Sequence, residues 1–172
     1  MANTYTLIEA KTLGSAVASV TFSSIPQTYT DLKLVMSARS TRAAFDDEVK
    51  ININGTGIGS NFTSRVLGGE GTAASQFSTS YSTGRITLGI QGSTTTASTF
   101  TSTEHYFPNY TGSNFKSISS DNTIEQNATA VFTDLSASLY SSTSAITSIA
   151  FSTTLGNFAQ YSTFYLYGIK NS

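Results

Sequence analysis

The amino-acid sequence predicts a single all-β domain over residues 1–172, folded as an antiparallel β-sandwich. Two observations lead to this prediction. Apolar and polar residues alternate along most of the chain, which is the pattern of strands with one buried face. Gly, Asn and Ser separate these stretches at short intervals, as turns do in sandwiches and barrels. The 11 Phe and 9 Tyr need burial, so a Ser and Thr content of about a third does not indicate disorder.

The first half of the chain contains five alternating stretches. The clearest follows the turn at Pro26 and places Leu32, Leu34 and Met36 on one face. Another ends in the hairpin-type pair Asn54-Gly55. Strands are therefore expected over residues 16–23, 31–39, 49–54, 62–66 and 86–90.

In the second half, one segment carries a competing signal. Between Thr123 and Leu139 the apolar residues have helical spacing, but the many Thr, Ser and Asn residues are unfavourable inside a helix. We predict a strand there, with a short helix before Val131 as the alternative. Strands are expected over residues 115–119, 130–140, 145–152 and 163–169. Long loops are expected over residues 55–59 with 68–71, and over residues 92–102.

Composition argues against several classes of function. Charged residues make up 11% of the chain and the formal net charge is -1, so the basic stripe of a nucleic-acid-binding protein is absent. The same balance argues against electrostatic docking to membranes. The N-terminus lacks the pattern of a signal peptide, and no apolar run reaches the 18 residues of a membrane span. There is no Cys, hence no disulfide framework and no thiolate chemistry.

The search for catalytic or metal-binding residues predicts neither an enzyme nor a cofactor. The single His, His105, lies among aromatic residues, and a zinc site would need more nitrogen or sulfur ligands. Among so many Ser residues, a Ser-His-acid combination carries no information. The acidic run Asp46-Asp47-Glu48 permits a cation site, but a solvated turn before a strand is favoured. Nearby Arg39 and Arg42 could pair with these acids or contact a neighbouring subunit.

A turn in the middle of the chain offers a possible sugar contact. Tyr and Asn can stack on and hydrogen-bond to sugars, and Tyr106, Asn109 and Tyr110 surround the Phe107-Pro108 pair. Core packing and turn chemistry are the alternative explanation. Together with Arg39 and Arg42, these three residues are the candidate surface contacts.

Both ends of the chain carry distinctive strand-and-turn patterns. They are Tyr5-Thr6-Leu7-Ile8, then residues 20–32 (VTFSSIPQTYTDL), then Ile146-Thr147-Ser148-Ile149, Gly156-Asn157-Phe158 and residues 162–170 (STFYLYGIK). With these patterns the chain resembles small structural proteins of tailed bacteriophages of aquatic and cyanobacterial hosts. The resemblance covers nearly the whole chain and is weakest over the central loops, residues 55–102.

The resemblance implies a jelly-roll-like sandwich on the outer surface of a virion, made in the host cytoplasm. It implies a capsid decoration, or cement, protein that binds the major capsid protein and itself, as a homo-oligomer and often a trimer. The alternative is a tail-fibre or receptor-binding module that recognises host glycans. The compact length favours decoration, because no coiled-coil or collagen-like shaft is present.

Overall fold

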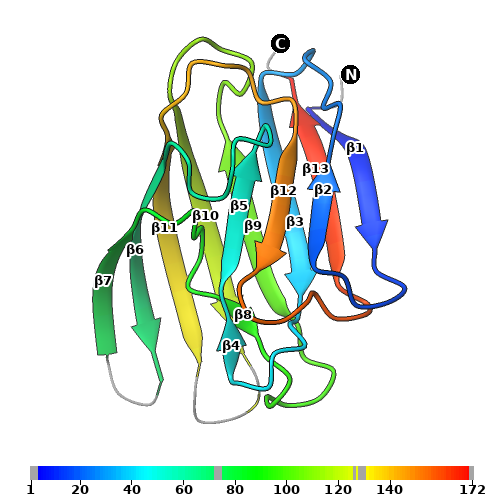
Figure 1. The fold of residues 1–172 in the computed structure, drawn as a ribbon, viewed down its shortest axis with the longest axis vertical. Helices are drawn as coiled ribbons and strands as arrows, with labels where there is room; N and C mark the ends of the chain where they lie inside the picture. Colours follow the sequence, from blue (N-terminus) through cyan, green and yellow to red (C-terminus); the bar gives the residue numbers. More distant parts are fainter. Residues whose placement is uncertain (1–3, 72–74, 126, 128–130, 171–172) are drawn as a thin grey trace.

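The computed structural model describes residues 4–71, 75–125, 127 and 131–170 and is an antiparallel β-sandwich with two unequal layers (Figure 1). The larger layer has eight strands in the order β1-β13-β3-β9-β10-β11-β6-β7. The predicted all-β sandwich is confirmed; its jelly-roll-like character stays a prediction. The strands of this layer are β1 (Tyr5–Thr12), β3 (Asp31–Ala38), β6 (Phe62–Glu70), β7 (Ser75–Tyr81), β9 (Thr101–Phe107), β10 (Lys116–Ile124), β11 (Phe132–Tyr140) and β13 (Thr163–Ile169).

The smaller layer lies in front of the large sheet in Figure 1. It consists of the three-stranded sheet β2-β12-β5 and the short pair β4-β8. Most of the apolar core lies between this layer and strands β1, β13, β3 and β9, where Phe158 packs edge-on against Phe164. The strands of the smaller layer are β2 (Ser19–Phe22), β12 (Ile149–Thr153), β5 (Val49–Ile53), β4 (Asp46–Asp47) and β8 (Ile90–Gln91).

The other half of the large sheet is covered by an irregular segment, residues 84–91. Its backbone groups have no continuous strand partner, so they bond to side chains that point inward from the sheet. Ser64 Oγ donates to the Arg85 carbonyl at 2.8 Å, and Asn122 Nδ2 donates to the Gly89 carbonyl at 3.1 Å. The inner face of this half is therefore rich in polar residues although it is buried.

The structure corrects several details of the sequence prediction. Residues 86–90 are buried but form a regular strand only at Ile90. Residues 68–70 belong to β6, so the second part of the first predicted loop is wrong. The sequence patterns do not predict strands β1, β7 and β9. Between Thr123 and Leu139 the structure has strand over residues 123–124 and 132–139, as predicted. The alternative of a short helix before Val131 falls partly on residues outside the described ones.

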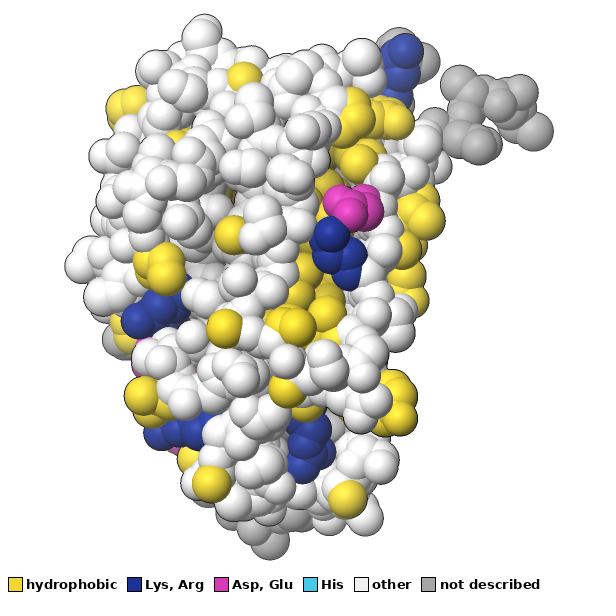
Figure 2. Space-filling model, turned by 45° about the vertical axis from the view of Figure 1, so that its right-hand side comes forward, with side chains coloured by type: hydrophobic (Ala, Val, Ile, Leu, Met, Phe, Trp, Pro, Cys, Tyr) yellow, Lys and Arg dark blue, Asp and Glu magenta, His cyan; other side chains and the backbone are white. Residues whose placement is uncertain are grey.

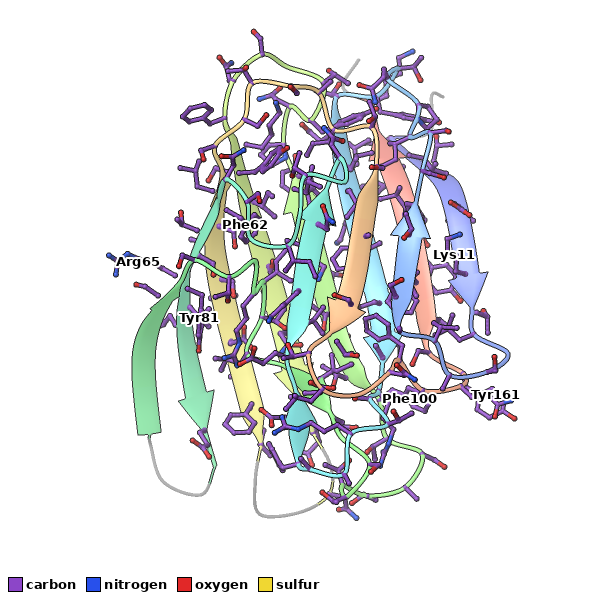
Figure 3. The ribbon with its side chains drawn as sticks, viewed as in Figure 1. Lys11, Phe62, Arg65, Tyr81, Phe100 and Tyr161 are labelled. Carbon is purple, nitrogen blue, oxygen red and sulfur yellow. The ribbon has the colours of Figure 1, made fainter. Side chains whose placement is uncertain are left out.

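The β1 edge of the large sheet is irregular and charged. Its pairing with β13 shifts register between Leu7 and Glu9, which marks a bulge. Lys11 Nζ bonds to Glu9 at 2.6 Å and lies 5.4 Å from the ring centre of Phe22, across the opening between the layers (Figure 3). Figure 2 shows the surface on this side, where apolar side chains form a narrow strip amid neutral polar groups. A bulge and charges discourage pairing with another strand at this edge.

Candidate interaction surface

A buried Ser-His pair is the first arrangement that could carry chemistry. His105 Nδ1 lies 2.7 Å from Ser120 Oγ, and the imidazole stacks on Phe151 with ring centres 5.4 Å apart. Burial lowers the pKa of His105 to about 3, far from the value a general base needs near neutral pH. The ring is fully buried, so the pair fits a structural role between the two layers.

A second buried cluster centres on Asp134. Its carboxylate accepts hydrogen bonds from Asn122 Nδ2 at 2.7 Å and from the Leu88 backbone N–H at 3.3 Å. Burial raises the pKa of this carboxyl, while its hydrogen bonds act in the opposite direction. Asn122 in turn accepts from Thr103 Oγ1 at 2.7 Å. These contacts join three strands to the covering segment and explain why polar residues point inward there.

The acidic run Asp46-Asp47-Glu48 makes hydrogen bonds and ion pairs within the protein. Asp47 is buried and accepts hydrogen bonds from Ser40 Oγ at 2.7 Å and the Gly156 N–H at 2.8 Å. Glu48 pairs with Arg85 at 2.7 Å. Among the described residues, no group of three or more His, Asp or Glu side chains is arranged to hold a metal ion. The favoured prediction of a solvated turn is wrong for Asp47, whose carboxylate ties two chain segments together.

Arg39 and Arg42, two of the predicted surface contacts, also serve the fold. The Arg39 guanidinium donates to the backbone carbonyls of Thr95, Thr96 and Thr99 at 2.7 to 3.0 Å and so holds the Ser- and Thr-rich loop that follows Gly92. Arg42 donates to the Asp46 carbonyl at 2.9 Å and lies 3.6 Å from the Asp46 carboxylate. The predicted pairing with the acidic run is therefore confirmed for Arg42 only.

Of the three residues predicted to contact sugars, the fold brings Tyr106 and Asn109 together and separates Tyr110 from them. Tyr110 is fully buried, so the predicted surface contact is wrong for this residue. The Tyr106 hydroxyl donates to Asp31 at 2.7 Å, and this bond raises the pKa of Tyr106 to about 12. The Asn109 side chain is exposed, while its backbone N–H donates to the same Asp31 carboxylate at 2.7 Å. Asp31 therefore fixes the turn through both residues.

Strand β11 has the reverse of the usual pattern for a sandwich strand. Its inward residues Asp134, Ser136 and Ser138 are polar and buried. Its outward residues Leu135 and Leu139 are apolar and are 58% and 39% exposed. The inner face of a sandwich normally takes the apolar residues. The leucines therefore contribute little to the core and leave apolar surface exposed on the outer face.

The outer face of the eight-stranded sheet gathers most of the exposed apolar bulk. Directly paired residues of an antiparallel sheet point to the same side, so the register defines this face row by row. Ten large apolar side chains are exposed in the described part of the chain, and six of them lie here. The six are Tyr5 and Leu7 on β1, Tyr106 on β9, Leu67 on β6, and Leu135 and Leu139 on β11. Large exposed apolar patches mark interaction sites.

Apart from Tyr106 on β9, the exposed apolar residues of the outer face fall into two groups. Lys33 on β3 pairs with Glu104 on β9 at 2.7 Å and stands between the groups. We call the side of β1, β13 and β3 the tyrosine half, and the side of β10, β11 and β6 the leucine half. Two adjoining hollows of about 520 and 380 Å³ lie over the leucine half, and Arg65 and Ala137 line both. The surface is therefore uneven enough to receive projecting side chains.

This surface is not predicted from the sequence, although the alternation of apolar and polar residues that forms it is visible there. The alternation in residues 132–140 can be read directly, but it does not say which side is covered. The usual rule assigns the apolar side to the core, and here that rule fails. The polar set Asp134, Ser136 and Ser138 is a weak hint, because a buried Asp is rare unless it is hydrogen-bonded.

Comparison with protein-family models gives no match, and comparison with curated protein sequences gives no significant similarity. Within the described residues, no helix is long and apolar enough to cross a membrane.

Proposed function

We propose that this chain is a structural protein of a tailed-phage particle, a capsid decoration protein that binds the major capsid protein and contributes no catalysis. The observation that carries the proposal is the outer face of the eight-stranded sheet, with six of the ten exposed large apolar side chains. A broad face on which large apolar groups are exposed suits binding to a protein surface. The virion setting rests on the sequence resemblance.

The reversed strand β11 adds support to a binding role. Folding alone does not favour Leu135 and Leu139 on an open face, since their solvent exposure costs free energy that polar residues would avoid. Contact with another protein subunit would recover this energy. The sugar-binding alternative has a weaker basis, because Tyr110 is buried and Asp31 binds the Tyr106 hydroxyl.

The tyrosine half is the part of the face that we assign to the capsid. Tyr5 and Leu7 are 53% and 50% exposed, and Tyr167 stands beside Leu7 in the same row. Tyrosine combines a large contact area with few rotatable bonds and is enriched at protein interfaces. Purified particles should therefore carry the chain over the whole shell, in a fixed ratio to the major capsid protein.

Co-sedimentation with isolated capsids tests the proposal. Leu7→Ser should weaken binding to the shell by about tenfold or more, as expected for an apolar anchor at an interface. Leu155→Ser is the matched control, because Leu155 is 67% exposed but lies outside the sheet face. Equal binding of both variants would contradict the docking face. Antibody labelling at the tail tip alone would contradict the capsid assignment and favour the tail module.

A further inference from the structure

The leucine half of the outer face presents projecting and hollow parts side by side. Leu67 and Leu135 are direct partners across β6 and β11, and each is 58% exposed. The next row places Arg65 beside Ala137 and Ala137 beside Ser119, so its centre consists of small side chains. A row of leucines next to a row of small residues can interlock with a second surface of the same kind.

Two charges flank these leucines without any partner in the part of the chain that the structure describes. Arg65 on β6 projects away from the sheet (Figure 3), and its side chain makes no hydrogen bond or ion pair. Asp121 on β10 is likewise exposed and unpaired. They lie on opposite sides of β11, two strand spacings and two residues along the strand apart, which places their backbones about 12 Å from each other.

The surroundings of Asp121 specifically favour a cation from another molecule. Asp121 is paired directly with Glu104 across β9 and β10, and like charges directly opposite each other destabilise a sheet. Lys33 bonds to Glu104 at 2.7 Å, which leaves Asp121 uncompensated. A guanidinium placed above Asp121 would relieve this repulsion.

We propose that the occupant of the leucine half is a second copy of this chain, docked face to face about a two-fold axis. Arg65 and Asp121 lie one strand away on either side of β11, and the point midway between them falls between Leu135 and Ala137. An axis in the interface through this point sets each Arg65 against Asp121 of the other copy. The leucines of both copies meet near the axis. A self-complementary patch of this kind closes with two copies, whereas the resemblance implies three.

The dimer is independent of the capsid assignment, because the leucine half and the tyrosine half are separate parts of the face. It is tested on the purified full-length chain alone, so its failure would not bear on shell binding. The chain offers a direct test through charge reversal. Arg65→Asp sets two carboxylates against each other at both contacts, and Asp121→Arg sets two guanidinium groups against each other. Each variant should raise the dimer dissociation constant by about tenfold or more.

Mixing the two variants supplies the decisive measurement. In a heterodimer of Arg65→Asp with Asp121→Arg, both contacts join opposite charges. One contact joins the introduced Asp to the introduced Arg, and the other joins the unchanged Arg65 to the unchanged Asp121. Native mass spectrometry and sedimentation equilibrium should therefore find wild-type dimers, two monomeric variants, and a heterodimer in the equimolar mixture. Leu135→Ser should also weaken the dimer, and Leu155→Ser should leave it unchanged.

Thermal unfolding of each variant confirms that it remains folded, since all the changed residues are exposed. A wild-type chain that stays monomeric at about 1 mM would overturn the proposal, because the dimer dissociation constant would then lie well above that concentration. A mixture that stays monomeric would overturn the Arg65–Asp121 contact. A wild-type trimer would overturn the two-fold arrangement.

Discussion

Protonation of His105 should set much of the acid sensitivity of this protein. The ring is fully buried and stacked on Phe151, and Nε2 has no hydrogen-bond partner among the described residues. A proton would place an uncompensated positive charge in the core. Burial accordingly lowers the pKa of His105 to about 3, from 6.5 when exposed. Since His105 is the single histidine of the chain, no other histidine contributes to the pH dependence of stability.

The sign and size of the effect follow from proton linkage. Below pH 6.5 the unfolded chain takes up a proton at His105 and the folded chain does not. Folding stability therefore falls as the pH drops from about 6.5 towards about 3. Between pH 7 and pH 5 the loss is about 2 kcal/mol, which corresponds to about 4–8 °C in Tm for a domain of this size.

The perturbation that isolates this effect is His105→Gln. Gln has no proton to gain, and its amide can still bond to Ser120. Urea unfolding at pH 7, 6 and 5 should show that the variant loses about 2 kcal/mol less than the wild type over this range. At pH 7 the variant is expected to be less stable, because the stacking on Phe151 is lost. Parallel pH curves for the two proteins would refute the reasoning.

Three further predictions concern the other buried and tethering groups. Burial raises the pKa of Asp134, so the folding stability of the wild type increases as the pH falls through that pKa. Asp134→Asn should remove this increase in the same urea series. An unaltered dependence of stability on pH would contradict the prediction. In Arg39→Lys the smaller set of donors on the lysine cannot bond to all the loop carbonyls. Amide hydrogen exchange over residues 93–99 should therefore become faster, while the free energy of unfolding changes by less than about 1 kcal/mol. Asp47→Ala leaves buried donors unpaired and should cost about 2–4 kcal/mol in urea unfolding, whereas calcium should not raise the wild-type Tm.

Sequence alternation predicts the strands that use apolar residues for the core. In β3 the alternation of Leu32, Leu34 and Met36 is enough, and all three are buried. Strand β9 escapes prediction because its inward residues include Thr103 and His105, so neither face is distinctly apolar. Its buried side bonds to neighbouring side chains, and that arrangement depends on contacts between distant segments.

Strand β11 shows why the helical alternative arises. Leu135 and Leu139 are four residues apart, and this spacing puts two residues on one face of a helix and equally on one face of a strand. Intervening Ser136 and Ser138 decide for the strand, because both point inward with Asp134. The candidate site residues could not be selected in the same way. Whether Arg39 or Arg65 is free depends on which loops fold back over the sheet.

The unequal layers of the sandwich link the buried polar cluster to the exposed leucines. Three regular strands cover one half of the large sheet, and the irregular segment 84–91 covers the other half. An irregular backbone needs hydrogen-bond partners, so the sheet beneath it presents Asn122 and Asp134 rather than apolar residues. The middle of β11 therefore has no apolar role inside, and only Tyr140 at its end belongs to the core. If the exposed leucines serve a contact outside, as we propose, removal of Leu135 should impair assembly while hardly changing the stability of the isolated chain.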